Sequence, residues 1–132
     1  MNEREKAVER LKTLLQLQTL LDKKYGTEQY NIFVFGSYIT TGYVEGHSDI
    51  DMAVYCAEFS LYKKISMEIE EFFYNYQVSV DIFYIDISMI TPFYCAALES
   101  KVRFTDYYPT ELEQFAKQCQ QKLYDIKERM AG

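Results

Sequence analysis

The segment FVFGSYITTGYVEGHSDIDMAVY, residues 33–55, constrains the fold of this 132-residue chain more than any other stretch. A short apolar strand runs into Gly36 and Ser37, a loop follows, and a second apolar strand carries Asp49 and Asp51. Aspartate is depleted in strands, and its burial costs free energy unless a positive charge accompanies it. Two aspartates on one strand therefore indicate a functional site, next to which the fold has to bring the Gly-Ser turn.

The hydrophobic pattern predicts helices that alternate with short strands. We expect helices over residues 3–24, 60–76, 91–99 and from 110 onward, and strands over 30–36, 48–56, 78–85 and 101–105. This order predicts a small α/β fold with a short mixed sheet flanked by helices. At this length, we expect one domain over residues 1–132.

Several helix ends and one buried stripe can be assigned from local signals. Ser60 and Thr91 are expected N-caps, and Thr110 with Glu113 reads as a capping box that opens the last helix. Gly26 is expected to end the first helix. The last helix carries apolar residues at helical spacing as far as Met130. The stripe expected on the first helix is Val8, Leu11, Leu14, Leu15 and Leu21.

The carboxylates on the strands predict a metal site. Asp49 and Asp51 are two residues apart, so their side chains leave the same face of the strand, about 7 Å apart at the backbone. Their charges repel, and one would take up a proton unless a cation sits between them. Mg²⁺ suits such oxygen ligands. Asp81 lies within the next apolar strand; if the two strands are neighbours, three carboxylates can hold two ions for phosphoryl chemistry, with Asp81 as base or second-metal ligand.

The Gly-Ser turn predicts a phosphate-binding backbone. Gly36 has no Cβ, so a ligand can approach the chain closely there. Ser37 offers a hydroxyl and a backbone N–H, and a helix starting at this point would attract phosphate at its N-terminus.

The combined pattern resembles the signature of the DNA polymerase beta-like nucleotidyltransferase superfamily, and within it the minimal nucleotidyltransferases of prokaryotes. The matching positions, within residues 30–106, are Gly36, Ser37, Gly42, Ser48, Asp49, Asp51, Asp81 and the closing stretch ESKVRFTD. The resemblance implies a nucleotidyltransferase fold. It implies nucleotide binding at the first four positions, and catalysis and metal binding at the three aspartates.

By resemblance, such proteins transfer a nucleotide monophosphate, commonly AMP from ATP, with Mg²⁺. Many are antitoxins that modify a tyrosine on a small helical HEPN-domain partner, which makes ATP and a HEPN-type protein the expected partners. One alternative is an adenylyltransferase acting on a small-molecule hydroxyl such as that of an aminoglycoside. Another is a catalytically weak protein that binds nucleotide or a partner. The absence of an obvious second domain favours a protein acceptor.

Two departures from the family pattern bear on activity. Eleven residues separate Ser37 from Asp49, where the family usually has ten, and no Arg precedes Gly42, which follows Thr40 and Thr41. The missing charge would weaken triphosphate binding, or would have to come from elsewhere. Lys63, Lys64 or a partner protein are the expected sources.

Composition and charge limit the partners and the cellular location that we expect for the protein. A net charge of −6 argues against nucleic acid and anionic membranes as partners, and a charged N-terminus without a signal peptide predicts a cytoplasmic protein. The three cysteines form no CxxC pair and read as reduced, buried thiols. His47 reads as a loop residue, and Ser48 as a residue that orients the strand. The sequence leaves open the acceptor, the preferred base and self-association into a homo-oligomer.

Overall fold

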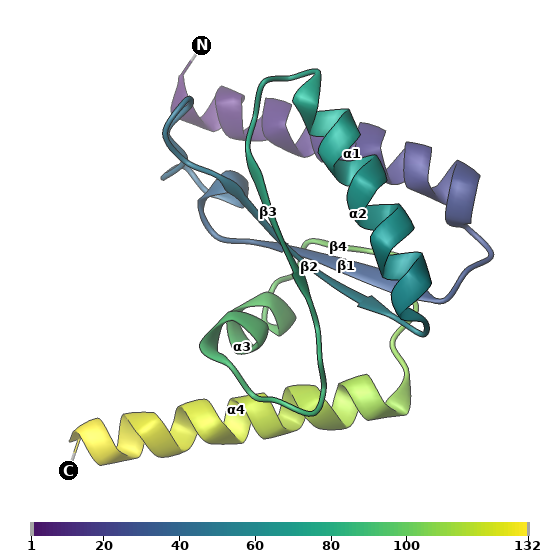
Figure 1. Cartoon of the computed structure of the whole chain (residues 1–132). Helices are drawn as coiled ribbons and strands as arrows, with labels where there is room; N and C mark the ends of the chain where they lie inside the picture. The colour runs from purple at the N-terminus through teal and green to yellow at the C-terminus, as the bar shows by residue number, and fades with distance from the viewer. Residues whose placement is uncertain (1, 132) are drawn as a thin grey trace.

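A four-stranded mixed sheet forms the centre of the molecule, with the strand order β3-β2-β1-β4 (Figure 1). The computed structural model describes residues 2–131. β1 (Tyr30–Phe35) pairs antiparallel with both β2 (Ile50–Cys56) and β4 (Arg103–Phe104). β3 (Val80–Tyr84) pairs parallel with β2. All four strands were predicted within a few residues, and the mixed sheet confirms the expected fold class.

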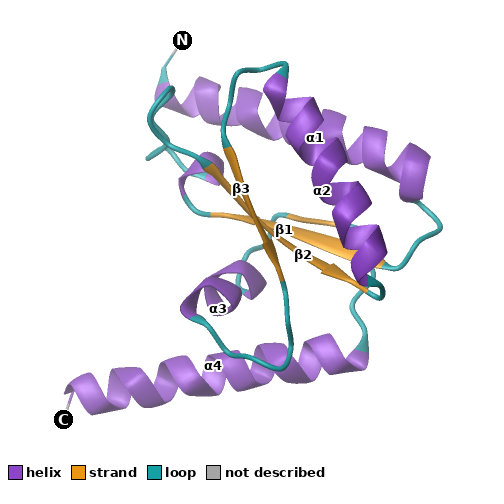
Figure 2. Cartoon of the chain, in the orientation of Figure 1, coloured by secondary structure: helices purple, strands orange, loops and turns teal. Residues whose placement is uncertain are grey.

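Helices cover both faces of this sheet (Figure 2). The helices are α1 (Glu3–Tyr25), α2 (Phe59–Tyr74), α3 (Pro92–Leu98) and α4 (Thr110–Ala131). α1 and α2 pack on one face, whereas α3 and α4 pack on the other. A single 3₁₀ turn, η1 (Ser37–Ile39), follows β1.

The two-residue period of β2 separates the two cores. Ile50, Met52 and Val54 are buried beneath α1 and α2. Ala53 and Tyr55 point the other way, into the core formed with α3 and α4. Because side chains alternate along a strand, the odd-numbered Asp51 belongs to the face that α3 and α4 cover.

The buried stripe of α1 differs from the expected one. Its buried residues are Arg10, Leu14, Leu17 and Leu21, whereas Val8, Leu11 and Leu15 are exposed. Leu11 and Leu15 line a shallow groove beside β4. β4 is only two residues long, so it leaves this flank of the helix uncovered. The predicted stripe is therefore correct at Leu14 and Leu21 and wrong at the other three positions.

Two of the expected helix ends are confirmed. Gly26 is the C-cap of α1. Thr91 is the N-cap of α3, and its side-chain oxygen accepts a hydrogen bond from the backbone N–H of Tyr94 at 3.2 Å. Pro92 follows at the first helical position, where its missing N–H costs no hydrogen bond.

The other two expected caps are wrong by one or two residues. α2 begins at Phe59 with Glu58 at the N-cap, which places Ser60 inside the helix. α4 begins at Thr110, and the carbonyl of Pro109 accepts hydrogen bonds from the N–H groups of Leu112 and Glu113. Since Thr110 is already helical, it does not act as the cap of the predicted capping box.

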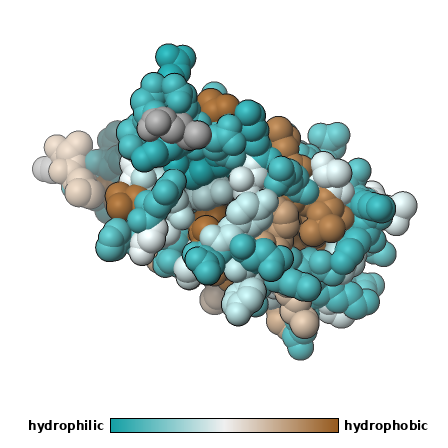
Figure 3. Space-filling model, turned by 90° about the horizontal axis from the view of Figure 1, so that it is seen from above, coloured by the Kyte–Doolittle hydropathy of each residue, from teal (hydrophilic) through white to brown (hydrophobic). Residues whose placement is uncertain are grey.

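The last part of α4 runs past the sheet (Figure 1). Leu112, Phe115 and Cys119 are buried, but Ile126 and Met130 are exposed, so the predicted apolar stripe is buried only in its first half. All three cysteines are free and buried, as expected. Viewed from above, the surface is mostly hydrophilic, with apolar side chains in separate patches (Figure 3). None of the helices within residues 2–131 is long and apolar enough to cross a membrane.

Candidate active site

Asp51 lies where three elements of the predicted site meet. In the antiparallel pair, Phe35 at the end of β1 stands opposite Asp51 near the start of β2, so the Gly36 turn begins beside this aspartate. In the parallel pair, Asp81 on β3 is in register with Asp51. The structure therefore brings Gly36, Asp51 and Asp81 to one end of the sheet, as the sequence predicted.

Gly36 is required at its position for two reasons. Its φ of +79° with ψ of −157° is a conformation that side chains with a Cβ rarely adopt. A Cβ added there would also lie 2.5 Å from Oδ2 of Asp51. Because Gly36 has no Cβ, the Asp51 carboxylate can approach the backbone closely at this position.

The surroundings of the Asp51 carboxyl favour the binding of a proton or a cation. Partial burial raises its pKa above the ordinary value of 3.8, and the negative charges of Asp81 and then Asp49 raise it further. A carboxyl whose charge is disfavoured by burial and by two neighbouring carboxylates is stabilised by a cation. The electrostatics thus agree with the expected metal ligand.

The side chains of the three aspartates do not form a preformed metal-binding site. Asp49 is exposed and lies one residue before β2, and Asp81 is also exposed. Within residues 2–131, no three acidic, histidine or cysteine side chains form a cluster that could hold a metal ion. Mg²⁺ usually takes only one or two carboxylates and completes its shell with water and substrate phosphates. The donor type therefore fits Mg²⁺ in a site that substrate oxygens complete.

The loop after Gly36 is closed by its own side chains. The hydroxyl of Thr40 donates to the carbonyl of Ser37 at 2.9 Å and accepts from the N–H of Gly42 at 3.1 Å. The helical segment that begins at Ser37 is a single turn of three residues. Phosphate binding here would depend on single N–H groups and the Ser37 hydroxyl, since one turn carries little helix dipole.

Ser48 is engaged within the loop that precedes β2. Its hydroxyl accepts from the N–H of Val44 at 3.1 Å, and its own N–H donates to the Val44 carbonyl at 2.8 Å. These bonds support the expectation that Ser48 orients the strand, and nucleotide binding by Ser48 stays a prediction. His47 is exposed in the turn just before it.

Arg10 of α1 also belongs to this region, and the sequence analysis missed it. Its Nε donates to the carbonyl of Tyr38 at 2.8 Å and its Nη2 to the carbonyl of Thr40 at 2.7 Å. The guanidinium lies 4.9 Å from the centre of the Tyr43 ring. The available signal was the spacing of Arg10 with the leucines at 14, 17 and 21, which places a charge on an apolar stripe.

Lys63 and Lys64 lie elsewhere. Both are exposed on α2, which begins beyond the far end of β2 and covers the face opposite Asp51. The Nζ of Lys63 is 5.2 Å from the centre of the Phe59 ring. These lysines are therefore not placed to supply the charge missing from the loop, and that expectation is wrong.

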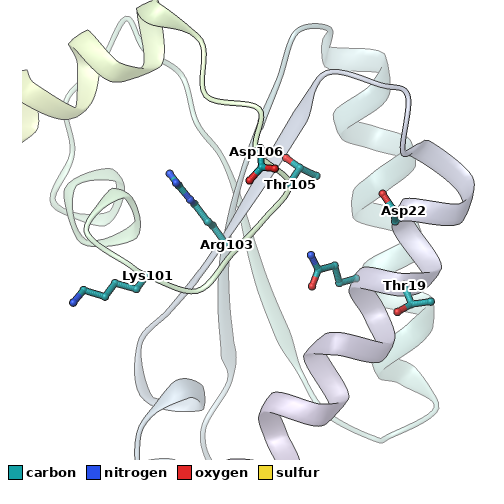
Figure 4. A pocket seen from close by; sticks show the side chains of 7 residues that line it. Thr19, Asp22, Lys101, Arg103, Thr105 and Asp106 are labelled. Atoms are coloured by element: carbon teal, nitrogen blue, oxygen red, sulfur yellow. The ribbon is translucent and has the colours of Figure 1, made fainter.

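A separate groove of about 570 Å³ lies between α1 and the β4 edge (Figure 4). In Figure 4, Lys101 and Arg103 extend away from Thr19 and Asp22 on α1. Its charged residues are two basic and two acidic, and it includes none of the predicted site residues. Size alone does not outweigh the chemistry of the aspartates, which remain the better candidate site.

Comparison with known proteins identifies the family and a shared fold. A family model described as "Polymerase beta, Nucleotidyltransferase" matches residues 15–128. A crystal structure described as a mutant of the toxin-antitoxin MntA-HpeT matches with 19% sequence identity and a TM-score of 0.52. That match covers 99% of this chain and 94% of the other, and it shows a shared fold. No curated protein sequence matches the chain.

Proposed function

The chain belongs to the polymerase beta nucleotidyltransferase family, and from this premise we propose that it transfers AMP from ATP to a hydroxyl group of a partner protein. The observation that carries the proposal is the register of Asp51 with Asp81, directly beside the Gly36–Ser37 turn. This arrangement places a turn suited to phosphate next to carboxylates suited to a cation.

The reaction assigns a role to each element. The acceptor oxygen attacks the α-phosphorus of ATP, forming a new P–O bond, while the bond from that phosphorus to the bridging oxygen breaks and pyrophosphate leaves. Asp81 takes the hydroxyl proton as general base. The Gly36–Ser37 turn holds the outgoing phosphates, and Asp49 and Asp51 orient the nucleotide.

Mg²⁺ would be held by Asp49 and Asp51, with Asp81 as a further ligand, and we expect two ions in the complete complex. When bound, it supplies positive charge that neutralises the phosphate oxygens. The raised pKa of Asp51 supports this part of the proposal, because burial and then the charges of Asp81 and Asp49 disfavour an unpaired carboxylate at this position.

The proposed acceptor is a tyrosine of a HEPN-type toxin, which would make the protein an antitoxin. The shared fold with the MntA-HpeT structure, over nearly the whole of both chains, supports this choice. Positioning accounts for much of phosphoryl-transfer catalysis, and a docked protein supplies it. A basic partner would also complement the net charge of −6.

The test uses ATP labelled at its α-phosphate, Mg²⁺ and separate candidate acceptors. We expect label on a tyrosine of a helical partner protein encoded nearby, and none on aminoglycosides. Labelled aminoglycoside with an unlabelled partner would replace the protein acceptor by the small-molecule alternative. ATP binding without transfer to any acceptor would instead indicate the catalytically weak binding protein.

A further inference from the structure

Arg10 is a buried cation beside the proposed phosphate-binding loop. Its side chain is only 7% exposed, on the stripe of α1 that packs against the sheet. Among residues 2–131, none of the ion pairs involves Arg10. Its contacts are two backbone carbonyls and the faces of Tyr38 and Tyr43. These partners stabilise a guanidinium without neutralising its charge.

A buried charge without a counter-ion costs free energy, so a compensating benefit is expected where it persists. The nearest segment is η1 with the residues that follow it, which contact α1 directly (Figure 1). This segment has no charged residue of its own, since residues 37–43 read SYITTGY. Arg10 thus brings a positive charge, from another element, to the loop that lacks one.

The two hydrogen bonds of Arg10 also set the direction of the loop peptides. In a planar trans peptide, the C=O and N–H groups point in opposite directions. The carbonyls of Tyr38 and Thr40 point to Arg10, so the N–H groups of Ile39 and Thr41 in the same peptide units point away from α1. α1 covers the face opposite Asp51. The bonds therefore turn these donors away from the helix.

We propose that Arg10 is a positioning residue for nucleotide binding: it fixes the 37–43 loop with its N–H groups toward the phosphates of the nucleotide and supplies the positive charge absent from the loop. This inference rests on the proposed function, because the loop is taken to hold phosphate. Arg10 acts through the loop and is not assigned contact with the reacting atoms.

The test compares Arg10→Gln and Arg10→Lys with the control Lys12→Gln, which removes one charge from an exposed position on the same helix. Affinities for Mg·ATP and for AMP are measured, together with amide hydrogen exchange of residues 37–43. For Arg10→Gln, we expect ATP affinity to fall about 10- to 100-fold and AMP affinity much less, because hydrogen bonds to charged groups are strong and ATP carries more charge.

Arg10→Lys keeps the charge but not the two-pronged donor, so we expect faster exchange in the loop with part of the ATP affinity restored. Lys12→Gln should match the wild type in every measurement. Folded Arg10 variants with unchanged ATP affinity would overturn the proposal, whatever the loop exchange shows. Loss of folding in both variants would equally overturn it, by assigning Arg10 to the core alone.

The wild type separates this inference from the proposed function. If the wild-type protein binds no ATP with Mg²⁺, the proposed function fails, whatever the Arg10 variants do. If it binds ATP and the Arg10 variants bind equally well, only the role of Arg10 fails.

Discussion

At the scale of single residues, the properties of Asp51 follow from its neighbours. The turn at Gly36 packs against one side of its carboxylate, and Asp81 stands in register on the other. Partial burial and two like charges raise its pKa, so the metal-free protein is destabilised when this group ionises. The same features that suit a cation therefore make Asp51 costly without one.

We predict a pH-dependent gain in stability for Asp51→Asn. Because the folded-state pKa is raised, the folded chain keeps this proton to higher pH than the unfolded chain, and stability falls as pH rises through the folded pKa. Thermal melts without metal should show Asp51→Asn above the wild type at pH 7, with the difference vanishing toward pH 4. Asp106→Asn, which removes one negative charge at an exposed position, is the matched control. A wild type more stable than Asp51→Asn at pH 7 without metal would contradict the prediction.

Asp81→Asn should separate nucleotide binding from transfer. If Asp81 serves the acceptor side as base, its removal leaves Mg·ATP affinity within a few-fold of the wild type and lowers transfer by about 10²- to 10⁴-fold, the usual range for a general base. Equilibrium binding and single-turnover transfer measure the two quantities. Equal losses in both would show that Asp81 acts chiefly in nucleotide binding.

Gly36→Ala should disturb the site in a way that Gly46→Ala does not. Both glycines have positive φ, so each substitution is expected to cost about 1–3 kcal/mol of backbone strain in unfolding free energy, and the contact with Asp51 adds to this cost at Gly36. Only at Gly36 does the added Cβ meet a carboxylate, whereas nothing lies within 4 Å at Gly46. Transfer activity should therefore fall in Gly36→Ala alone, and similar activity in both variants would refute this distinction. Chemical denaturation measures the stability of each variant.

At the scale of elements, the strands could be predicted from the sequence, whereas the face of α1 that is buried could not. The two-residue alternation in β2 and the aspartate on β3 pointed to a shared site for Asp51 and Asp81, on the condition that the two strands are neighbours, and the structure meets this condition. In α1, apolar residues at 8, 11 and 15 compete with those at 14, 17 and 21 for the buried face. The short strand β4 determines which of the two sets is buried. Its length depends on the tertiary packing of the sheet and not on the pattern of α1. The role of Arg10 was missed for the same reason, since it lies on the stripe that is buried.

The orientation of α1 on the sheet can be tested by paired substitutions. Leu17 is fully buried, so Leu17→Ala should lower the free energy of unfolding by about 2–5 kcal/mol. Leu15 is 60% exposed, and Leu15→Ala should change it by less than about 0.5 kcal/mol. Urea denaturation measures both values. Equal losses would mean that α1 is rotated relative to the arrangement described.

At the scale of the whole molecule, the residues of the candidate site lie together at one end of the sheet. β1 ends there, and β2 and β3 begin there, so a turn and two acidic strand starts meet. α1 holds the loop from the opposite face through Arg10. The sequence motif predicted the residues, but the geometry of the loop depends on Arg10, which precedes Tyr38 by 28 positions.

The most direct measurement of the central claim is Mg²⁺-dependent transfer of α-phosphate label from ATP to the partner protein, compared among the wild type, Asp51→Asn and Asp106→Asn. Asp106 follows β4 at the other edge of the sheet, so its variant controls for the loss of one negative charge. We predict full transfer by the wild type and Asp106→Asn, and a loss of at least about 100-fold in Asp51→Asn. Undiminished transfer by Asp51→Asn would contradict the assignment of this end of the sheet as the active site.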